Sequence, residues 1–406
     1  MRGMRIPIPP RLIVAALLAI FCLGAPEAPW RHTANGGARA NGPESSAADE
    51  VYWSVQTSGI DTNLRGVSAA AISEATAARH SGDAPDADYI AVWACGSNGV
   101  ILLSKDSGKT WKRLHVAGGD SLDFRGIVAF DETTAYVMSS GEGDKSRIYK
   151  TLDGGQNWKL QYTDTRKAFF LDALVCDGDC YALGDPVDGK FVVVRGQNGE
   201  NWKELPSDAM PAALSGEGAF AASGTALAMD NDGDLYFGTG GAKTARVFHS
   251  PDFGKTWSVV ETPIASGNAS SGIFSIAMYA SSLVAVGGDY KEPKRTDRVA
   301  AYSQDAGKTW TLAAQQPGGY RSGAAFVYGA MLALGPTGEE ISQDFGAHWK
   351  RMGSLDLNAA FILDIFNGWA VGANGTVARL VNHMQYQIRN DGRPNDSSRA
   401  YSASKK

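Results

Sequence analysis

Charged and polar side chains recur near the beginnings of several apolar segments, usually beside a small residue. The full set comprises Arg65, Arg125, Asp172, Glu217, Ser275, Tyr320 and Arg321, and Asp185, Asp289 and Tyr290 follow later apolar segments. A guanidinium grips planar anions through parallel hydrogen bonds, so converging arginines would suit a carboxylate or a phosphate. The alternative is structural, with arginines and acids from neighbouring segments pairing to hold the fold together.

The histidines and cysteines show no spacing typical of a metal site or a catalytic triad. No Gly-x-Ser-x-Gly nucleophile motif is present, and the many Gly-x-Gly pairs are typical of turns. Asp230-Asn-Asp-Gly-Asp234 begins like a calcium loop, but it lacks the closing glutamate and the flanking helices, which favours a β-turn. We therefore predict no catalytic residue, no metal site and no cofactor.

One phrase, Ser/Thr-x-Asp-x-Gly-x-x-Trp, recurs roughly every 40 to 55 residues. It is clear at five places, which begin at Ser104, Thr151, Ser250, Ser303 and Ser342, and a worn copy lies at Arg195–Trp202. Such a period indicates an array of similar structural units.

The composition of this phrase is that of a tight turn between two strands. Aspartate accepts hydrogen bonds from backbone N–H groups further along, glycine supplies a positive φ, and tryptophan opens the next strand with a large apolar ring. We expect a structural role for the repeated residues Asp106, Trp111, Asp153, Trp158, Asp252, Trp257, Asp305, Trp310, Asp344 and Trp349.

Seven apolar segments that end in glycine precede or accompany the repeats, one more than the repeated phrases. The last unit lacks the phrase and its final strand, whereas Val51–Gly59 looks like such a final strand with no unit before it. The two halves complete each other, which removes exposed sheet edges. The sequence predicts an all-β, seven-bladed β-propeller with four-stranded blades over residues 50–382, closed by the N-terminal strand.

The ends of the chain differ from this region. Arg2, Arg5 and Arg11 and the apolar run Leu12–Leu23 are typical of a signal peptide, here residues 1–25, with an uncleaved anchor as the alternative. Residues 26–49 have the composition of a flexible linker, and residues 383–406 that of a disordered tail. We expect an exported monomer, periplasmic or secreted, with no membrane span beyond the first segment.

Export would permit disulfides. Cys176 and Cys180 enclose the hairpin turn Asp-Gly-Asp, where they either form a small disulfide loop or remain thiols, and Cys95 lies in an apolar strand as a buried thiol. The net charge of −5 and the absence of a Lys/Arg run exclude a nucleic-acid footprint.

The repeated phrase resembles the Asp-box, or bacterial neuraminidase repeat, of β-propellers. Beyond it, Asn63-Leu-Arg65-Gly-Val67, Gly96-Ser-Asn-Gly99 and Gly368-Trp-Ala-Val-Gly-Ala-Asn-Gly375 resemble the photosystem II stability and assembly factor family over most of residues 50–382. The resemblance implies seven blades and a chaperone-like binder of a photosystem subunit, with a basic patch as its binding face.

Two functions follow as hypotheses. The first is an exported, non-catalytic propeller that binds a protein or an envelope component at the mouth of its central channel. The second is a sialidase-like Asp-box glycoside hydrolase acting on an anionic sugar, in which Arg65, Arg125 and Arg321 hold a carboxylate while Glu217 activates Tyr290 or Tyr320. Arginines that do not converge would exclude this second set. An oxidoreductase lacks any supporting cofactor motif.

Overall fold

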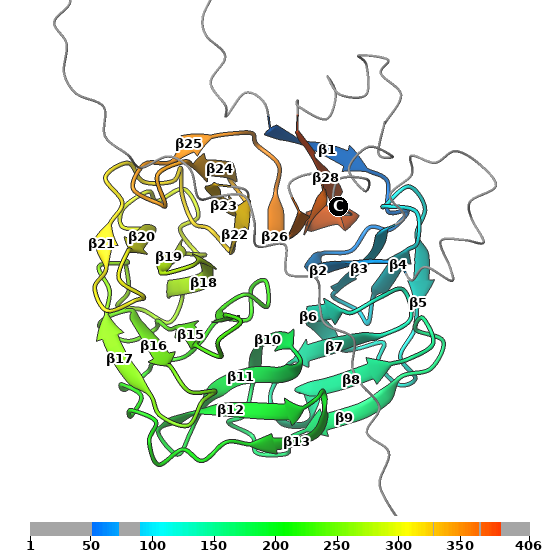
Figure 1. Cartoon of the computed structure of the whole chain (residues 1–406), viewed down its shortest axis with the longest axis horizontal. Helices are drawn as coiled ribbons and strands as arrows, with labels where there is room; N and C mark the ends of the chain where they lie inside the picture. Colours follow the sequence, from blue (N-terminus) through cyan, green and yellow to red (C-terminus); the bar gives the residue numbers. More distant parts are fainter. Residues whose placement is uncertain (1–50, 73–89, 328, 365–366, 383–406) are drawn as a thin grey trace, which may run out of the picture. The chain divides into compact units, whose positions relative to one another are not determined.

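The computed structural model describes residues 51–72, 90–327, 329–364 and 367–382, all within the compact unit Ser45–Lys406. Their strands form seven four-stranded antiparallel sheets, which Figure 1 shows as blades around a ring. The expected seven-bladed β-propeller is therefore confirmed. The expected signal peptide (1–25), linker (26–49) and tail (383–406) lie outside the described residues. Within these residues, no helix is both long and apolar enough for a membrane crossing.

The blades follow one another along the chain, each written here from its inner to its outer strand. Blade 1 has β2 (Leu64–Ala71), β3 (Ile90–Gly96), β4 (Ile101–Ser104) and β5 (Lys112–Leu114). Blade 2 has β6 (Asp123–Ala129), β7 (Ala135–Ser140), β8 (Arg147–Thr151) and β9 (Lys159–Thr163). Blade 3 has β10 (Leu171–Asp177), β11 (Asp179–Val187), β12 (Lys190–Gln197) and β13 (Glu200–Glu204). Blade 4 has β14 (Leu227–Met229), β15 (Leu235–Gly238), β16 (Arg246–Ser250) and β17 (Ser258–Glu261).

Blade 5 has β18 (Ser271–Tyr279), β19 (Ser282–Asp289), β20 (Ala300–Ser303) and β21 (Thr311–Leu312). Blade 6 has β22 (Gly323–Val327), β23 (Ala330–Gly335), β24 (Gly338–Ser342) and β25 (Lys350–Arg351). Blade 7 has β26 (Leu357–Asp364), β27 (Asn367–Gly372), β28 (Val377–Asn382) and β1 (Val51–Gln56). Short 3-10 turns lie at η2 (Gly143–Lys145) and η3 (Ala373–Gly375).

The N-terminal strand β1 closes the ring. It pairs antiparallel with β28, from Val51 opposite Asn382 to Gln56 opposite Val377. Blade 7 therefore takes its outer strand from the beginning of the propeller and its other strands from the end. This pairing covers an edge of β28 that would otherwise be free to pair with another chain.

The repeated phrase forms the same turn between the third and fourth strands of its blades. In blade 1, Ser104 Oγ accepts a hydrogen bond from the Gly108 N–H (2.8 Å) and donates one to Asp106 Oδ1 (2.7 Å). Asp106 Oδ1 also accepts from the Thr110 N–H at 2.8 Å, and the indole of Trp111 donates to the Gly108 carbonyl at 3.1 Å. Gly108 has φ of +85°, a conformation that glycine adopts without strain. The polar groups of the turn are thus hydrogen-bonded to one another, and the tryptophan ring lies on the surface of the blade.

Apolar clusters fill the interfaces between neighbouring blades. The middle strands are buried on both faces, as in β3 and β7, because each blade is packed between two others. Seven clusters occur in the described part of the chain, and each contains one tryptophan from an outer strand or its turn: Trp53, Trp111, Trp158, Trp202, Trp257, Trp310 and Trp349. Trp53 of β1 therefore packs into its cluster from blade 7 as the tryptophans of the repeated phrase pack into theirs from the other blades.

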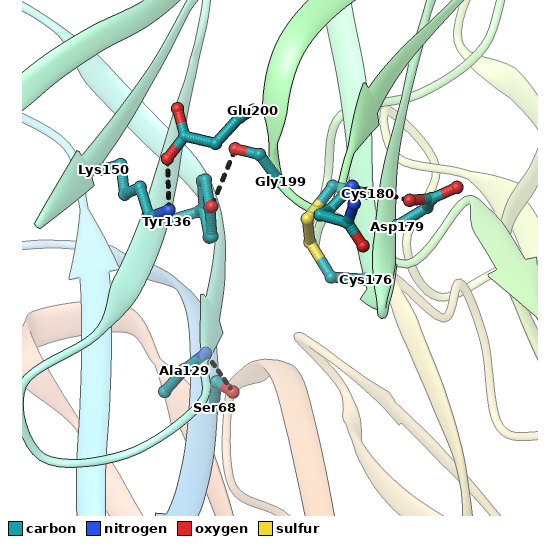
Figure 2. Close-up of a disulfide and its surroundings, with 10 residues drawn as sticks. Ser68, Ala129, Tyr136, Lys150, Cys176, Asp179, Cys180, Gly199 and Glu200 are labelled. Carbon is teal, nitrogen blue, oxygen red and sulfur yellow. Dashed lines mark hydrogen bonds and ion pairs between the residues drawn. A yellow bond between two sulfur atoms is a disulfide. The ribbon is translucent and has the colours of Figure 1, made fainter. Parts of the chain in front are cut away.

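A disulfide joins Cys176 and Cys180 across the β10–β11 hairpin (Figure 2). The two residues face each other in the strand register, which decides between the alternatives left open by the sequence. Cys95 is a buried free thiol. Figure 2 also shows how neighbouring blades are tied, with the Tyr136 hydroxyl of β7 donating to the Gly199 carbonyl of blade 3 at 2.8 Å.

Candidate binding site at the mouth of the channel

Five inner strands carry a β-bulge near their beginnings. The register shifts between Leu64 and Gly66 in β2, and at the equivalent places in β6, β10, β18 and β26. The bulged residues are Arg65, Arg125, Asp172, Phe274 and Asn358. A bulge turns a side chain out of the regular alternation of a strand, and here it directs these side chains toward the channel.

These side chains line a cavity of about 520 Å³ at one end of the channel, to which all seven blades or the segments leading into them contribute. Its lining residues are Arg65, Arg125, Phe170, Asp172, Asp185, Ala219, Phe220, Ala221, Ala222, Ala269, Phe274, Tyr290, Tyr320, Ser322, Pro336 and Asn358. The repeated turns lie at the other end of the blades. In blade 1, Leu64 pairs with Gly96 at the end of the sheet that faces the cavity. Ser104, where the repeated turn begins, pairs with Val92 near the opposite end of the sheet.

The segment before β14 reaches from blade 4 into the ring. Its Ala221 carbonyl accepts a hydrogen bond from Arg125 of blade 2 at 3.0 Å, and Ser223 Oγ donates to the Ser322 carbonyl of blade 6 at 2.8 Å. Gly224 has φ of +71°, and a Cβ there would lie 2.8 Å from the Arg125 carbonyl oxygen. A residue without a side chain is therefore required where this segment meets β6, and the segment forms part of the cavity wall.

Two arginines form the basic part of the cavity. Arg125 is engaged, since its Nε and Nη2 atoms contact Asp123 Oδ2 at 2.8 and 2.7 Å. Arg65 is different: its buried Nε has no hydrogen-bond partner among residues that the structure describes. Burial and the adjacent Arg125 guanidinium lower the pKa of Arg65. The guanidinium of Arg65 is thus a donor in the cavity wall that an anion would satisfy.

Two carboxyl groups of blade 3 form the acidic part. Asp172 is 1% exposed, and its Oδ2 has no hydrogen-bond partner in the described ranges. Burial, and then the nearby Asp185, raise the pKa of Asp172 well above the ordinary value, while Arg125 opposes the shift. Burial raises the pKa of Asp185 to about 6, although this carboxyl accepts a hydrogen bond from the Ala219 N–H at 2.9 Å.

Aromatic rings from blades 4, 5 and 6 form a third part of the wall. Phe220 stacks on Phe274 with ring centroids 3.9 Å apart, and Phe274 meets Tyr320 edge to face at 4.8 Å. Burial raises the pKa of Tyr320, so its phenol stays protonated. The ring centroids of Tyr290 and Phe274 are 6.2 Å apart, and Tyr290 is 47% exposed. The cavity therefore combines a cationic, an acidic and an aromatic region.

Of the ten residues expected at the channel mouth, six line the cavity: Arg65, Arg125, Asp172, Asp185, Tyr290 and Tyr320. The other four do not. Ser275 is buried behind the wall, where its Oγ accepts from the Ala324 N–H at 2.9 Å. Asp289 shapes a turn, accepting from the Lys291 N–H and from Asn268. Glu217 is buried in an ion pair with Arg246, which anchors the segment before β14.

Arg321, which was expected at the channel mouth, instead lies in the core of blade 6. Its side chain is fully buried, and its guanidinium contacts Glu340 of β24 at 2.5 and 2.6 Å. The sialidase-like arrangement is therefore not assembled, because neither Arg321 nor Glu217 faces the cavity that contains Arg65 and Arg125. A buried arginine needs a buried acid, and Glu340 supplies it within the same blade.

The cavity also contains residues that were not expected, chiefly Phe274, Ser322 and Asn358, together with Phe170, Phe220 and Pro336. A sequence pattern that would find Phe274 and Asn358 is apolar-x-small, in which x faces the cavity. It occurs as Ile273-Phe274-Ser275 and Leu357-Asn358-Ala359, with the first residue fully buried. In blade 6 the corresponding segment is Arg321-Ser322-Gly323, with an arginine at the apolar position, and Ser322, not Arg321, faces the cavity.

The chain matches no protein-family model, and no curated protein sequence matches it significantly. Among solved structures it is similar to YCF48, a photosystem II assembly factor, from Cyanidioschyzon merolae. The TM-score is 0.56 at 15% sequence identity, covering 82% of this chain and 99% of that chain. A structure of YCF48 bound to D1 peptide gives a TM-score of 0.55 at 14% identity, covering 81% and 97%. This protein therefore has the propeller fold of YCF48.

Proposed function

We propose that this protein is a non-catalytic propeller that binds an extended segment of a partner protein at the channel mouth, as an assembly factor does. One observation carries the proposal: Arg65 lines a cavity to which every blade or the segment leading into it contributes, and it keeps a buried donor without a partner among the described residues. A buried donor left unpaired is costly, and a carboxylate of a bound segment would remove that cost.

The other parts of the wall suit a peptide as well. The rings of Phe220, Phe274 and Tyr290 offer apolar area to side chains, and buried aromatic area is a main source of binding energy. A solved structure with a similar fold carries D1 peptide. That likeness supports a peptide as ligand but does not specify its sequence.

An anionic carbohydrate is the second candidate. The observation in its favour is that aromatic rings and a guanidinium share the cavity wall, since Tyr320 interacts electrostatically with Arg65 and contacts Phe274. A sugar ring can stack on an aromatic face while its carboxylate contacts the arginine.

We further propose that the protein acts outside the cytosol. The disulfide between Cys176 and Cys180 supports this, because disulfides persist in oxidising compartments. The basic and apolar pattern of residues 1–25 adds the expectation of a targeting segment.

The test is selection of peptides from a random display library on the full chain, followed by affinity measurements. We expect acidic peptides, with Kd raised about tenfold or more in Arg65→Gln, since a hydrogen bond to a charged group contributes roughly 1.5–3 kcal/mol. Arg113→Gln is the matched control, because Arg113 is exposed on the outer strand β5 and the change in net charge is the same.

Peptides that bind Arg65→Gln as tightly as the wild type would contradict the proposed site. If no peptide binds, sialic acid and glucuronic acid are tested by thermal shift. A shift lost in Arg65→Gln and kept in Arg113→Gln would then favour the carbohydrate candidate.

A further inference from the structure

We infer that the acidic part of the cavity, formed by Asp172 and Asp185, binds a cationic side chain of the same segment whose carboxylate contacts Arg65. The ligand would then be dipolar, with one lysine or arginine and one aspartate or glutamate at a fixed spacing. This inference rests on the proposed function and specifies the chemistry of the partner.

The first argument is the state of Asp172. Its side chain lines the cavity, is 1% exposed, and leaves Oδ2 without a partner in the described ranges. Buried carboxyl oxygens in folded proteins accept hydrogen bonds or pair with cations, because leaving one unpaired is costly. The bulge between Leu171 and Ala173 turns this residue out of the core of blade 3. A donor from a ligand is the partner that the wall does not supply.

The second argument is the charge around it. Arg125 is the cation that interacts electrostatically with Asp172, but it already contacts Asp123 and the Ala221 carbonyl. Asp185 lies close enough to raise the pKa of Asp172, and among the described residues its carboxyl accepts only the Ala219 N–H. Once Arg65 holds the ligand's carboxylate, the described residues that line the cavity offer Asp172 and Asp185 no cation other than Arg125. The acidic part therefore lacks positive charge.

The third argument is placement. Arg65 belongs to blade 1, Arg125 to blade 2, and both acids to blade 3. Arg125 belongs to the blade between those of Arg65 and Asp172, and it interacts electrostatically with both. A ligand that satisfies both must carry its opposite charges at separate points, and this fixes its direction across the cavity. Two charges of one sign would leave one of these groups unsatisfied.

A cation bound here makes the affinity depend on pH. The groups that face the acid pair are Arg125 of β6 and the Ala219 N–H, with Asp172 on β10 and Asp185 on β11. Because the free carboxyls hold protons more tightly than ordinary ones, a cation must displace those protons. Affinity then rises over the interval in which the pH increases through about 6, the pKa of Asp185. If a protonated Asp172 instead donated a hydrogen bond to an anion, affinity would fall over the same interval.

The experiment uses acetylated, amidated peptides in which glutamate and arginine are separated by one, two or three glycines. Each is compared with its citrulline counterpart, which has nearly the same shape as arginine but no charge. For one spacing we expect the arginine peptide to bind the full chain about tenfold or more tightly than the citrulline peptide. We also expect proton release on binding, measured by calorimetry in buffers of different ionisation enthalpy.

The matched variants are Asp172→Asn, which keeps the shape of the side chain, and Asp208→Asn, which removes one charge at an exposed position. The preference for arginine should vanish in Asp172→Asn and remain in Asp208→Asn. If arginine and citrulline peptides bind equally but are weakened by Arg65→Gln, this inference is wrong and the proposed function stands. Proton uptake in place of release would also overturn it. If no peptide of the set binds and the display library also yields none, the proposed function fails with it.

Discussion

Near the beginning of the inner strands, one residue packs into the core and the residue after it faces the cavity. Leu64, Phe124 and Leu171 occupy the core position and are fully buried. In blade 6 the same position holds Arg321, also fully buried, and its contacts with Glu340 replace an apolar contact by an ion pair. Breaking a buried pair leaves an uncompensated charge, whereas replacing both members by apolar residues is often neutral.

Arg321→Ala should therefore lower the free energy of unfolding by about 3–5 kcal/mol. The double variant Arg321→Leu/Glu340→Leu should regain most of this loss, because leucine occupies the equivalent position in other blades. Urea denaturation of the full chain measures both. A single variant as stable as the wild type would show that the pair is not buried in solution.

Because of the acid pair, the protein should lose stability as the pH rises, whereas the usual effect of carboxyl groups is a loss of stability as the pH falls. The folded-state pKa of Asp185 is about 6, against 3.8 for an ordinary aspartate, so the folded state binds more protons than the unfolded one. Stability is then greatest below pH 4 for this group and is lost as the pH rises through about 6. One pKa unit corresponds to about 1.4 kcal/mol, so the loss is about 3 kcal/mol at most.

Asp185→Asn should match the wild type near pH 4 and exceed its unfolding free energy by up to about 3 kcal/mol near pH 7. The asparagine Oδ1 can still accept the Ala219 N–H. Urea denaturation at several pH values gives the comparison, with Asp208→Asn as the exposed control. A difference between Asp185→Asn and wild type that is independent of pH would contradict the burial of this carboxyl.

At the scale of elements, strands β10 and β11 carry the two aspartates of the cavity at one end and the two disulfide-bonded cysteines at the other. Asp172 and Asp185 stand at the cavity, while Cys176 and Cys180 join the strands at the far hairpin. The disulfide therefore constrains the two strands that position the acid pair. For so short a loop the chain-entropy model gives about 2 kcal/mol of stabilisation.

Adding a reductant, or introducing Cys176→Ser with Cys180→Ser, should lower the free energy of unfolding by about 2 kcal/mol. The double serine variant should not respond to reductant, which separates this effect from that on Cys95. Chemical denaturation in oxidising and reducing buffer provides the measurement. An unchanged transition in the reduced protein would mean that the strand register alone holds the hairpin.

How far the sequence predicted these elements depends on what each pattern encodes. The repeated turns encode local hydrogen bonds, so phrases such as Ser104–Trp111 predicted their own structure and, by their period, the blades. The cavity depends on which residue of each inner strand bulges, which is a matter of strand register. Arg65 and Asp172 could be predicted, whereas Arg321 could not, since its partner Glu340 lies on another strand.

At the scale of the whole molecule, stability depends on closing the ring. β1 pairs with β28 along its full length, and Trp53 enters the cluster between blades 6 and 7. Without that strand, β28 would be an exposed edge and one interface would lose its tryptophan. The other interfaces, each with its own tryptophan, would be left to hold an open ring.

Trp53→Ala should therefore lower the free energy of unfolding by about 3–5 kcal/mol, the usual cost of truncating a buried tryptophan. Tyr52→Ala is the control on the same strand, because Tyr52 is 50% exposed while Trp53 is 7% exposed, and its effect should stay within about 0.5 kcal/mol. Trp349→Ala, in the neighbouring interface, should cost about as much as Trp53→Ala. Urea denaturation followed by circular dichroism compares the three variants. If Trp53→Ala behaves like Tyr52→Ala, blade 7 holds without its N-terminal strand, and closure contributes less than its apolar contacts imply.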